Sequence, residues 1–435
     1  MGDGLTAPTS DKTAGIGAEF ETRDFHLTMP GCSKANTDAA KRKIIAGRAG
    51  TNFQLTADTG SQAGVLTPEY IMRGDLIKVG SGSAAAKAGA AAAADLMAWW
   101  PWNPDGTPRS DTNNIQVADS PCNPWSVIRI SKGVTPENVV WDAQITAPIP
   151  LEALYYLMGQ AHNNAQPSDR NILSGDELLR AGNPTGPNLV FVTKDYFASL
   201  PNGIRPADVT DDILGFCSLV LTYAKGAKYT LHPDQSPKLL FQFMPRTEFN
   251  TIFQQVKTKM PGGLFAIFNI LACYKLQDKK LVIDRDYCTG SLAMPVPNQE
   301  FGKLTYKNSA PGPEPRPSVN VKAWIDGIGS GTGVKDALSV FDESIDGSIG
   351  GLGTAIEKMY NSQRAVPLFE FRDLIARMPK TSEFESFMGT ADTAVQTLHR
   401  DFATVPRRKK RYIPANCFLA AASAMTSSAT AVTST

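Results

Sequence analysis

Two glutamates separated by one residue stand near the start of the chain, in the segment Gly17-Ala18-Glu19-Phe20-Glu21. In an extended strand the side chains alternate between faces, so Glu19 and Glu21 share one face, about 6.5–7 Å apart along the chain. Like charges on one strand face repel each other, so this face is either solvated or binds a cation. Magnesium in proteins takes one or two carboxylates together with phosphate oxygens of a substrate, and the pair suits such a site.

Further charged residues lie in short segments in which apolar and polar residues alternate, as they do in strands. Asp58 ends a segment that begins with an aromatic residue, and Glu69 lies in the next extended segment. Much later, Glu370 and Arg372 flank a phenylalanine, so they share a strand face. These residues could complete an anion or metal site if the fold brings their strands together.

Two cations, Lys238 and Arg246, come before a helix predicted over residues 247–256. A guanidinium at this place suits bidentate recognition of phosphate or carboxylate. The alternative is an ion pair at the start of the helix between Arg246 and Glu248.

The order of these segments resembles the amidoligase, or carboxylate–amine ligase, family that is related to glutamate–cysteine ligase and glutamine synthetase. That pattern has a G-x-E-x-E strand, an aromatic-started strand ending in Asp, a strand with Glu and Ile or Val, and a late E-x-R strand. The matching segments are Gly17–Glu21, Phe53–Asp58, Glu69–Ile71 and Glu370–Arg372. The chain departs from the pattern at residues 144–148, where the family often has a strand with a histidine.

The resemblance implies an α+β fold, glutamine-synthetase-like, with a curved antiparallel sheet around an ATP site and helical insertions. It implies a ligase that uses ATP and Mg²⁺ to join a carboxylate to an amine through an acyl phosphate, with small molecules or peptides as substrates. It further implies these roles: metal ligands Glu19, Glu21 and Glu370; catalytic residues Arg372, Arg246 and Asp58; ATP-binding residues Lys238, Arg246 and Arg372; and a substrate-binding residue, Glu69, which with Asp58 could instead bind metal or the incoming amine.

The elements that must position these residues are predicted from alternation, helical spacing and the places of proline and glycine. The expected strands cover 15–21, 52–58, 65–79, 125–130, 139–146, 189–193 and 367–372. The expected helices cover 84–99, 150–160, 175–181, 247–256, 263–274 and 334–341, with a further helix around Ile213 to Tyr223. The predicted organisation is a lead-in over 1–12, a single α+β catalytic domain over 13–415 with a helical insertion at about 150–275, and a low-complexity tail over 416–435.

Composition narrows the classes of protein. The 43 Lys and Arg against 42 Asp and Glu, a net charge of +1, argue against a chain whose main role is to coat nucleic acid or an acidic membrane. No membrane span and no signal peptide are predicted, which favours a cytoplasmic protein. The six cysteines are widely and irregularly spaced, so separate reduced thiols are expected.

Two other classes of function remain open from the sequence. One is a non-catalytic structural or self-assembling protein, which the long loops, the balanced charge and the Ala/Ser/Thr tail allow; an oligomer is compatible with either class. The other is an effector or toxin-like enzyme that uses the same fold.

A few segments carry weaker signals. The start Met1–Thr6 fits an N-myristoylation pattern, the cluster Arg407–Arg411 fits a nuclear address or phosphate contact, and the glycine-rich segment 327–353 fits a hinge or lid. The tryptophans between Trp99 and Trp102 fit either a substrate mouth or the packing of a long loop onto the sheet, and packing is favoured.

Overall fold

The computed structural model describes residues 10–59, 62–155, 197, 209–229, 243–264, 266–267, 274–277, 280–283, 303–304, 319–330, 356–372 and 378–403. The chain divides into two compact units. The sheet unit comprises residues 13–147, 373–398 and 416–435, and the insertion unit comprises 1–12, 148–372 and 399–415. The predicted catalytic domain spans both units, and its unity stays a prediction.

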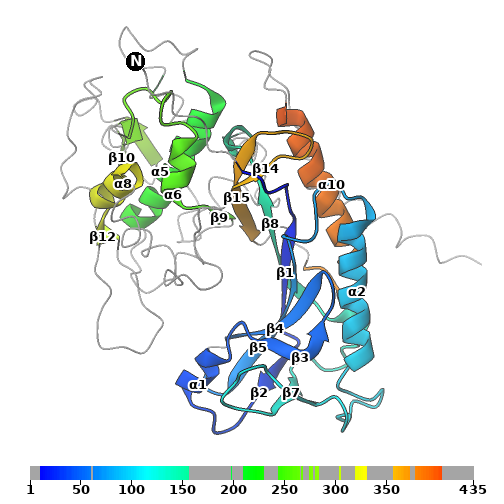
Figure 1. Cartoon of the computed structure of the whole chain (residues 1–435). Coiled ribbons are helices and arrows are strands. Elements are labelled where there is room, and N and C mark those ends of the chain that lie inside the picture. Colours follow the sequence, from blue (N-terminus) through cyan, green and yellow to red (C-terminus); the bar gives the residue numbers. More distant parts are fainter. Residues whose placement is uncertain are drawn as a thin grey trace, which may run out of the picture. The chain divides into compact units, whose positions relative to one another are not determined.

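The sheet unit is built on an antiparallel sheet, whose strands appear from blue to cyan in Figure 1. Its strands follow the order β8–β1–β5–β2–β7–β6, with β4 paired to β5 and β3 paired to β4. Their bounds are β1 Gly17–Thr22, β2 Phe25–Thr28, β3 Ile44–Ala49, β4 Phe53–Thr59, β5 Val65–Met72, β6 Asn114–Ile115, β7 Trp125–Arg129 and β8 Trp141–Pro148.

A kink separates β1 from β2, which pair with consecutive parts of β5. Glu21 stands opposite Glu69, whereas Leu27 stands opposite Leu66, so the β1–β2 segment holds three more residues than β5 over the same stretch. Asp24 stabilises this kink, since its carboxylate accepts hydrogen bonds from the Ser131 hydroxyl (2.5 Å) and from the backbone N–H of Val140, just before β8 (2.8 Å).

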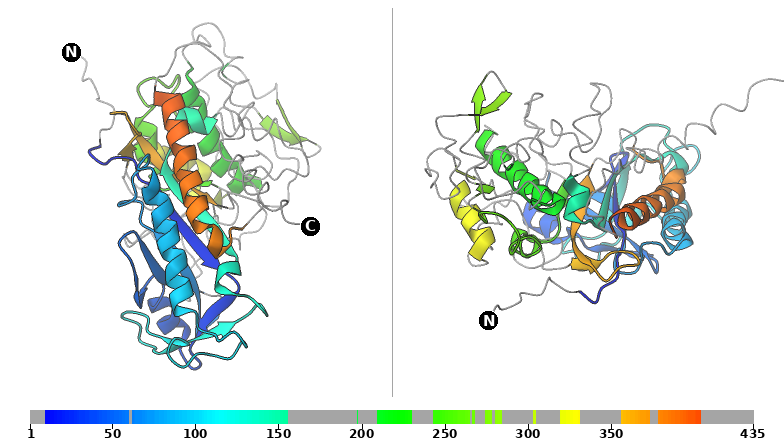
Figure 2. Two further views of the ribbon diagram at one scale, coloured as in Figure 1. Left: turned by 90° about the vertical axis from the view of Figure 1, so that its right-hand side faces the viewer. Right: turned by 90° about the horizontal axis from the view of Figure 1, so that it is seen from above.

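Two long helices, α2 (Ser83–Trp99) and α10 (Phe384–Ala403), run side by side in Figure 2, and all of α2 and residues 384–398 of α10 belong to the sheet unit. They meet where Gly89 faces the backbone of Phe384: a Cβ on Gly89 would lie 2.3 Å from the Phe384 carbonyl oxygen. The alanine-rich sequence of α2 favours a helix, and Pro101 ends it because the residue before a proline is pushed into an extended conformation. Phe384 also stacks on Phe20 of β1 with 4.1 Å between ring centroids, so the helices cover the Phe20 face of the sheet.

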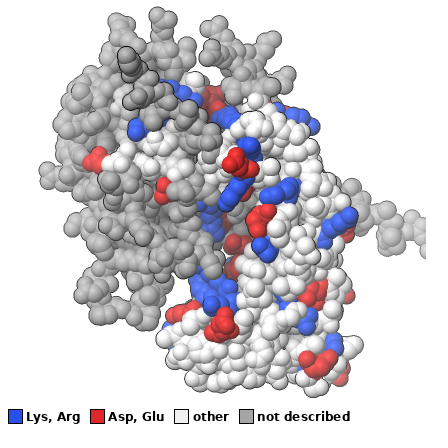
Figure 3. Space-filling model, in the orientation of Figure 1, with Lys and Arg blue, Asp and Glu red and all other residues white. Residues whose placement is uncertain are grey.

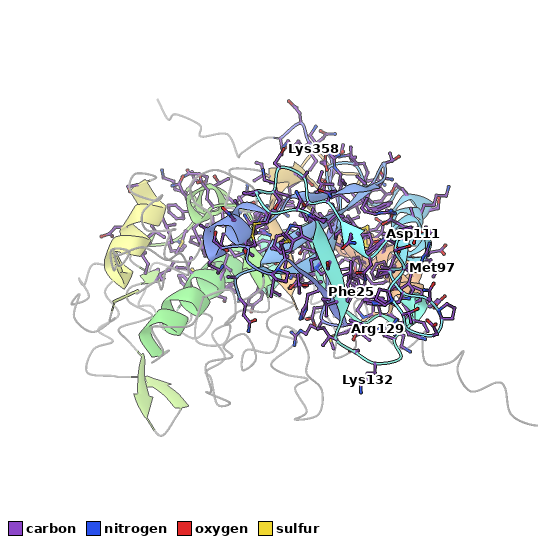
Figure 4. The ribbon with its side chains drawn as sticks, turned by 90° about the horizontal axis from the view of Figure 1, so that it is seen from below. Phe25, Met97, Asp111, Arg129, Lys132 and Lys358 are labelled. Atoms are coloured by element: carbon purple, nitrogen blue, oxygen red, sulfur yellow. A yellow bond between two sulfur atoms is a disulfide. The ribbon has the colours of Figure 1, made fainter. Side chains whose placement is uncertain are left out.

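The tryptophan cluster is part of the core. Trp99, Trp100 and Trp102 are 1–7% exposed and meet Phe25 of β2 edge-on, with ring centroids 5.8–6.1 Å apart. Arg129, labelled beside Phe25 in Figure 4, lies over the Trp102 ring at 4.6 Å. The expectation that the tryptophans pack the long loop onto the sheet is confirmed.

The expectation of six separate thiols is wrong. Cys32 and Cys122 form a disulfide across 90 residues, joining the loop after β2 to the loop before β7. The β2–β7 pairing brings the two loops together, and the spacing of cysteines in the sequence contains no signal of that pairing. Cys217 is a buried free thiol, and Cys273, Cys288 and Cys417 lie outside the described residues.

The insertion unit holds two of the helices that the sequence predicts in the middle of the chain, α5 (Asp211–Tyr229) and α6 (Phe249–Gln254), a helix that was not predicted, α8 (Val321–Ser330), and short antiparallel strands. Strand β15 (Ala365–Arg372) pairs with β14 (Ile356–Lys358) and with β9 (Phe243–Pro245). Two further pairs are β10 (Tyr274–Gln277) with β11 (Lys280–Ile283) and β12 (Lys303–Leu304) with β13 (Val319–Asn320). Lys259 forms an ion pair with the buried Asp212 near the start of α5. Gly215 of α5 approaches the helical turn at 151–155 so closely that a Cβ would lie 2.1 Å from the Leu151 carbonyl oxygen.

The structure is therefore a mixed α and β fold with a largely antiparallel sheet, as predicted; curvature around an ATP site stays a prediction. The predicted helix over 263–274 is wrong at its end, because Tyr274 begins β10. The predicted elements over 175–181, 189–193 and 334–341 lie outside the described residues. In the part of the chain that the structure describes, no helix is long and apolar enough to cross a membrane.

Candidate functional site

The paired glutamates lie on β1 as expected, on the face of the sheet that the helices leave uncovered. Ala18, Phe20 and Thr22 are buried, whereas Glu19 and Glu21 are partly exposed. Phe20 packs under α10 on the other face, and side chains alternate along a strand. The burial of one face therefore determines that both carboxylates share the opposite face.

The register of the sheet adds two carboxylates to this pair. Glu69 of β5 stands directly opposite Glu21, and Asp142 of β8 stands opposite Glu21 on its other side. We call the surface formed by Glu19, Glu21, Glu69 and Asp142 the acidic face. Sequence analysis missed Asp142, although the alternation of apolar and polar residues from Trp141 to Gln144 indicates a strand with Asp142 on its polar side.

Neighbouring groups stabilise parts of the acidic face. Glu69 is only 6% exposed, and its Oε2 lies 3.4 Å from the hydroxyl of Thr56, the residue opposite it on β4. Arg23, in the kink between β1 and β2, pairs with Asp142 at 2.9 Å. The described surface in Figure 3 likewise shows Lys and Arg side chains close to Asp and Glu.

Asp58 lies on the same face of the sheet as Thr56, two residues farther along β4. Its carboxylate pairs with Lys41 at 3.3 Å. The structure therefore brings Asp58, Glu69, Glu19 and Glu21 onto one face of one unit. Their functional roles stay predictions.

The remaining predicted site residues belong to the insertion unit. The carboxylate of Glu370, 1% exposed, forms an ion pair with Nε of Arg246 at 2.5 Å, between the paired strands β15 and β9. Glu248 accepts a hydrogen bond from Thr251. Arg372 ends β15, and Lys238 lies outside the described residues.

The donor groups of the acidic face are hard oxygen ligands, which suit Mg²⁺ or Mn²⁺. Among the described residues, no three His, Cys, Asp or Glu side chains lie close enough to hold a metal ion by themselves. Magnesium in proteins often takes only one or two carboxylates and completes its coordination with nucleotide phosphates.

Of the described histidines, His399 is held by structural hydrogen bonds. His399 is fully buried, and its Nδ1 accepts from the Tyr360 backbone N–H while its Nε2 donates to the Pro148 carbonyl oxygen. Only the neutral imidazole can make both bonds, and burial lowers the pKa of His399. Burial also lowers the pKa of His26 on β2.

Comparisons with known proteins give little. No family model matches the chain, and no curated protein matches it. Two similar solved structures come from Vibrio cholerae. One is a mutant ACD domain of a VgrG toxin in complex with ADP and Mn²⁺, with TM-score 0.35 and 13% identity, covering 86% of this chain and 99% of that chain. The other is a toxin of the MARTX/VgrG family, with TM-score 0.40 and 14% identity, covering 86% of this chain and 100% of that chain. Both scores are too low to establish a shared fold, so the site is interpreted from its own residues.

Proposed function

We propose that the chain is a ligase that uses ATP and Mg²⁺ to join a carboxylate to an amine through an acyl phosphate. The observation that carries this proposal is the acidic face, where Glu21 and Glu69 stand opposite each other on paired strands, with Glu19 beside them. The order of acidic and basic strand segments along the chain, which resembles amidoligases, supports the same function.

The spacing of the carboxylates on the acidic face suits a cation. Directly opposite residues in an antiparallel pair have Cβ atoms about 4.5–5.5 Å apart. A divalent cation at Glu21 and Glu69 would be attracted by both carboxylates. When bound, magnesium neutralises the β- and γ-phosphate oxygens during phosphoryl transfer.

The proposed reaction has two steps. A substrate carboxylate oxygen attacks the γ-phosphorus of ATP and ADP leaves, which turns a poor acyl donor into an acyl phosphate. The amine nitrogen then attacks the carbonyl carbon, inorganic phosphate leaves, and the nitrogen gives up a proton. We expect Asp58 to bind the incoming amine and accept this proton.

The first test is a thermal-shift measurement with Mg²⁺ alone, ATP alone and both together. A ligand at 100 times its Kd stabilises the native state by about 2.7 kcal/mol, so a clear rise in Tm is expected with both ligands. Glu21→Gln should abolish the rise, because it removes one of the two opposed carboxylates. Glu385→Gln, the same charge change at an exposed position of α10, is the matched control and should respond like the wild type.

A second test addresses ligation itself. Hydroxylamine reacts with acyl phosphates to give hydroxamates, so ATP-dependent hydroxamate should form from a mixture of amino acids and peptides with carboxyl side chains. Release of ADP without hydroxamate would argue for a nucleotide hydrolase instead. No thermal shift with any combination would remove support for a nucleotide site and leave the structural or self-assembling class.

A further inference from the structure

Arg23 follows the last residue of β1 and lies at the edge of the acidic face. Its Nε forms an ion pair with Oδ2 of Asp142 at 2.9 Å, and Asp142 stands opposite Glu21 in the β1–β8 pair. This contact places the guanidinium beside the carboxylates, although the Arg23 side chain is 85% exposed. The acidic face therefore has a cation at the end where β1 meets the kink.

The backbone on both sides of Arg23 is held against the segment that leads into β8. The buried Thr22 hydroxyl donates to the Val140 carbonyl oxygen (2.9 Å) and accepts a hydrogen bond from the Asp24 N–H (3.1 Å). The Asp24 carboxylate in turn accepts from the Val140 N–H (2.8 Å). These bonds fix the point from which the Arg23 side chain starts, and such preorganisation reduces the cost of binding a ligand.

The pair with Asp142 leaves most of the guanidinium available. Among the described residues, it is the one ion-pair or hydrogen-bond interaction of the Arg23 side chain, and it is made through Nε. Arg73, by contrast, gives both Nε (3.4 Å) and Nη2 (2.9 Å) to the carboxylate of Asp75. An exposed ion pair contributes little to stability, so stability alone does not explain an arginine at residue 23. Nη1 and Nη2 of Arg23 remain as donors for a second anion.

A guanidinium in this place complements a cation on the acidic face. Carboxylates repel a phosphate group that approaches alone, because both carry negative charge. Magnesium bound to the phosphate oxygens reverses this repulsion, and an arginine at the edge of the site can bind the remaining oxygens. A planar guanidinium does so with two parallel hydrogen bonds, a geometry that an ammonium lacks.

We propose that Arg23 binds a phosphate group of the magnesium-bound nucleotide at the acidic face through Nη1 and Nη2, while the ion pair of its Nε with Asp142 positions the guanidinium. The contact with Asp142 places Arg23 at this face, and its terminal amino groups supply the donors. The inference rests on the proposed function, since it assigns a further binding residue to the same site.

Arg23→Gln separates this role from a structural one. Its Tm without ligand should stay close to that of the wild type, because an exposed ion pair contributes little to stability. Its affinities for pyrophosphate and for ATP, each measured by calorimetry in excess Mg²⁺, should fall at least tenfold. Arg73→Gln is the matched control: it removes the same charge from an arginine that Asp75 already occupies, and should keep wild-type affinity. Arg23→Lys should recover only part of the affinity, since one ammonium has to serve both Asp142 and the phosphate.

The outcomes distinguish the inference from the proposed function. If Arg23→Gln binds both probes like the wild type, or loses affinity together with a clear loss of Tm, Arg23 has no phosphate-binding role, while binding of ATP and hydroxamate formation by the wild type keep the ligase proposal. Full recovery in Arg23→Lys would show that charge alone suffices and would overturn the bidentate role. If pyrophosphate binds in an Arg23-dependent way but no hydroxamate forms, the phosphate site stands and the ligase proposal falls. Binding of neither probe to the wild type would overturn both.

Discussion

The disulfide between Cys32 and Cys122 offers a prediction whose magnitude follows from the structure. The perturbation is the double variant Cys32→Ser/Cys122→Ser, or reduction of the wild type. The bond closes a loop of 90 residues in the unfolded chain. The chain-entropy relation then gives roughly 4.6 kcal/mol of stabilisation at 25 °C, as an upper value if the open chain keeps residual structure.

Urea unfolding followed by tryptophan fluorescence measures this effect in the right part of the molecule. Trp99, Trp100, Trp102, Trp125 and Trp141 all belong to the sheet unit. With an m-value of about 2 kcal/mol/M, the expected loss lowers the urea midpoint by about 2 M. The double variant should have the same midpoint with and without a reducing agent, which controls for the other cysteines.

Two results would refute this reasoning. One is an unchanged midpoint for wild type in which alkylation and mass mapping show Cys32 and Cys122 to be reduced. The other is a lowered midpoint in the reduced double variant as well, because the loss would then come from another thiol. A drop much smaller than 2 M with full reduction would indicate that the β2–β7 pairing already restricts the unfolded loop.

Three further predictions concern packing and pH. Gly89→Ala should lower Tm and reduce the free energy of unfolding by about 1–3 kcal/mol, because the new Cβ would lie 2.3 Å from a backbone oxygen of α10. Gly389→Ala is the control and should keep or raise Tm, because its Cβ would meet its nearest neighbour at an ordinary 3.5 Å. Burial raises the pKa of Asp392, so its ionised form weakens the fold as pH rises through that pKa, and Asp392→Asn should raise Tm at pH 7 but not at pH 3. Burial lowers the pKa of His399 in the folded protein, below the value of about 6.5 in the unfolded chain. The contribution of His399 to the free energy of unfolding is therefore full above about pH 6.5 and is lost as the pH falls from there through the folded pKa. Urea midpoints at about pH 7.5 and 5.5 should show this loss in the wild type and a smaller loss in His399→Asn.

Local pattern was sufficient to predict several elements of the two units. Alternation predicted β1, β4, β7 and β15 within a few residues, and the alanine-rich run predicted α2. These segments have a strong period or composition of their own, so their conformation hardly depends on distant residues.

Some elements were not predicted, for reasons that the structure identifies. In α10 the buried residues Phe384, Phe387, Met388, Val395 and Leu398 are spaced three, four or seven apart, which is a helical signal that sequence analysis overlooked. β2 has only four residues, too few for alternation to stand out. The disulfide could not be predicted, because it depends on two loops that meet only when β2 and β7 pair.

The acidic face shows how long-range register turns such local signals into a site. Alternation alone places Glu21 and Glu69 on the polar sides of their strands, but does not make them neighbours. A slip of one residue between β1 and β5 would move Glu69 to the face covered by the helices, where Tyr70 now packs. Because Phe20 stands opposite Tyr70 and both are fully buried, the aromatic core excludes that slip. The packing on one face of the sheet therefore places the carboxylates of Glu21 and Glu69 opposite each other on the other face.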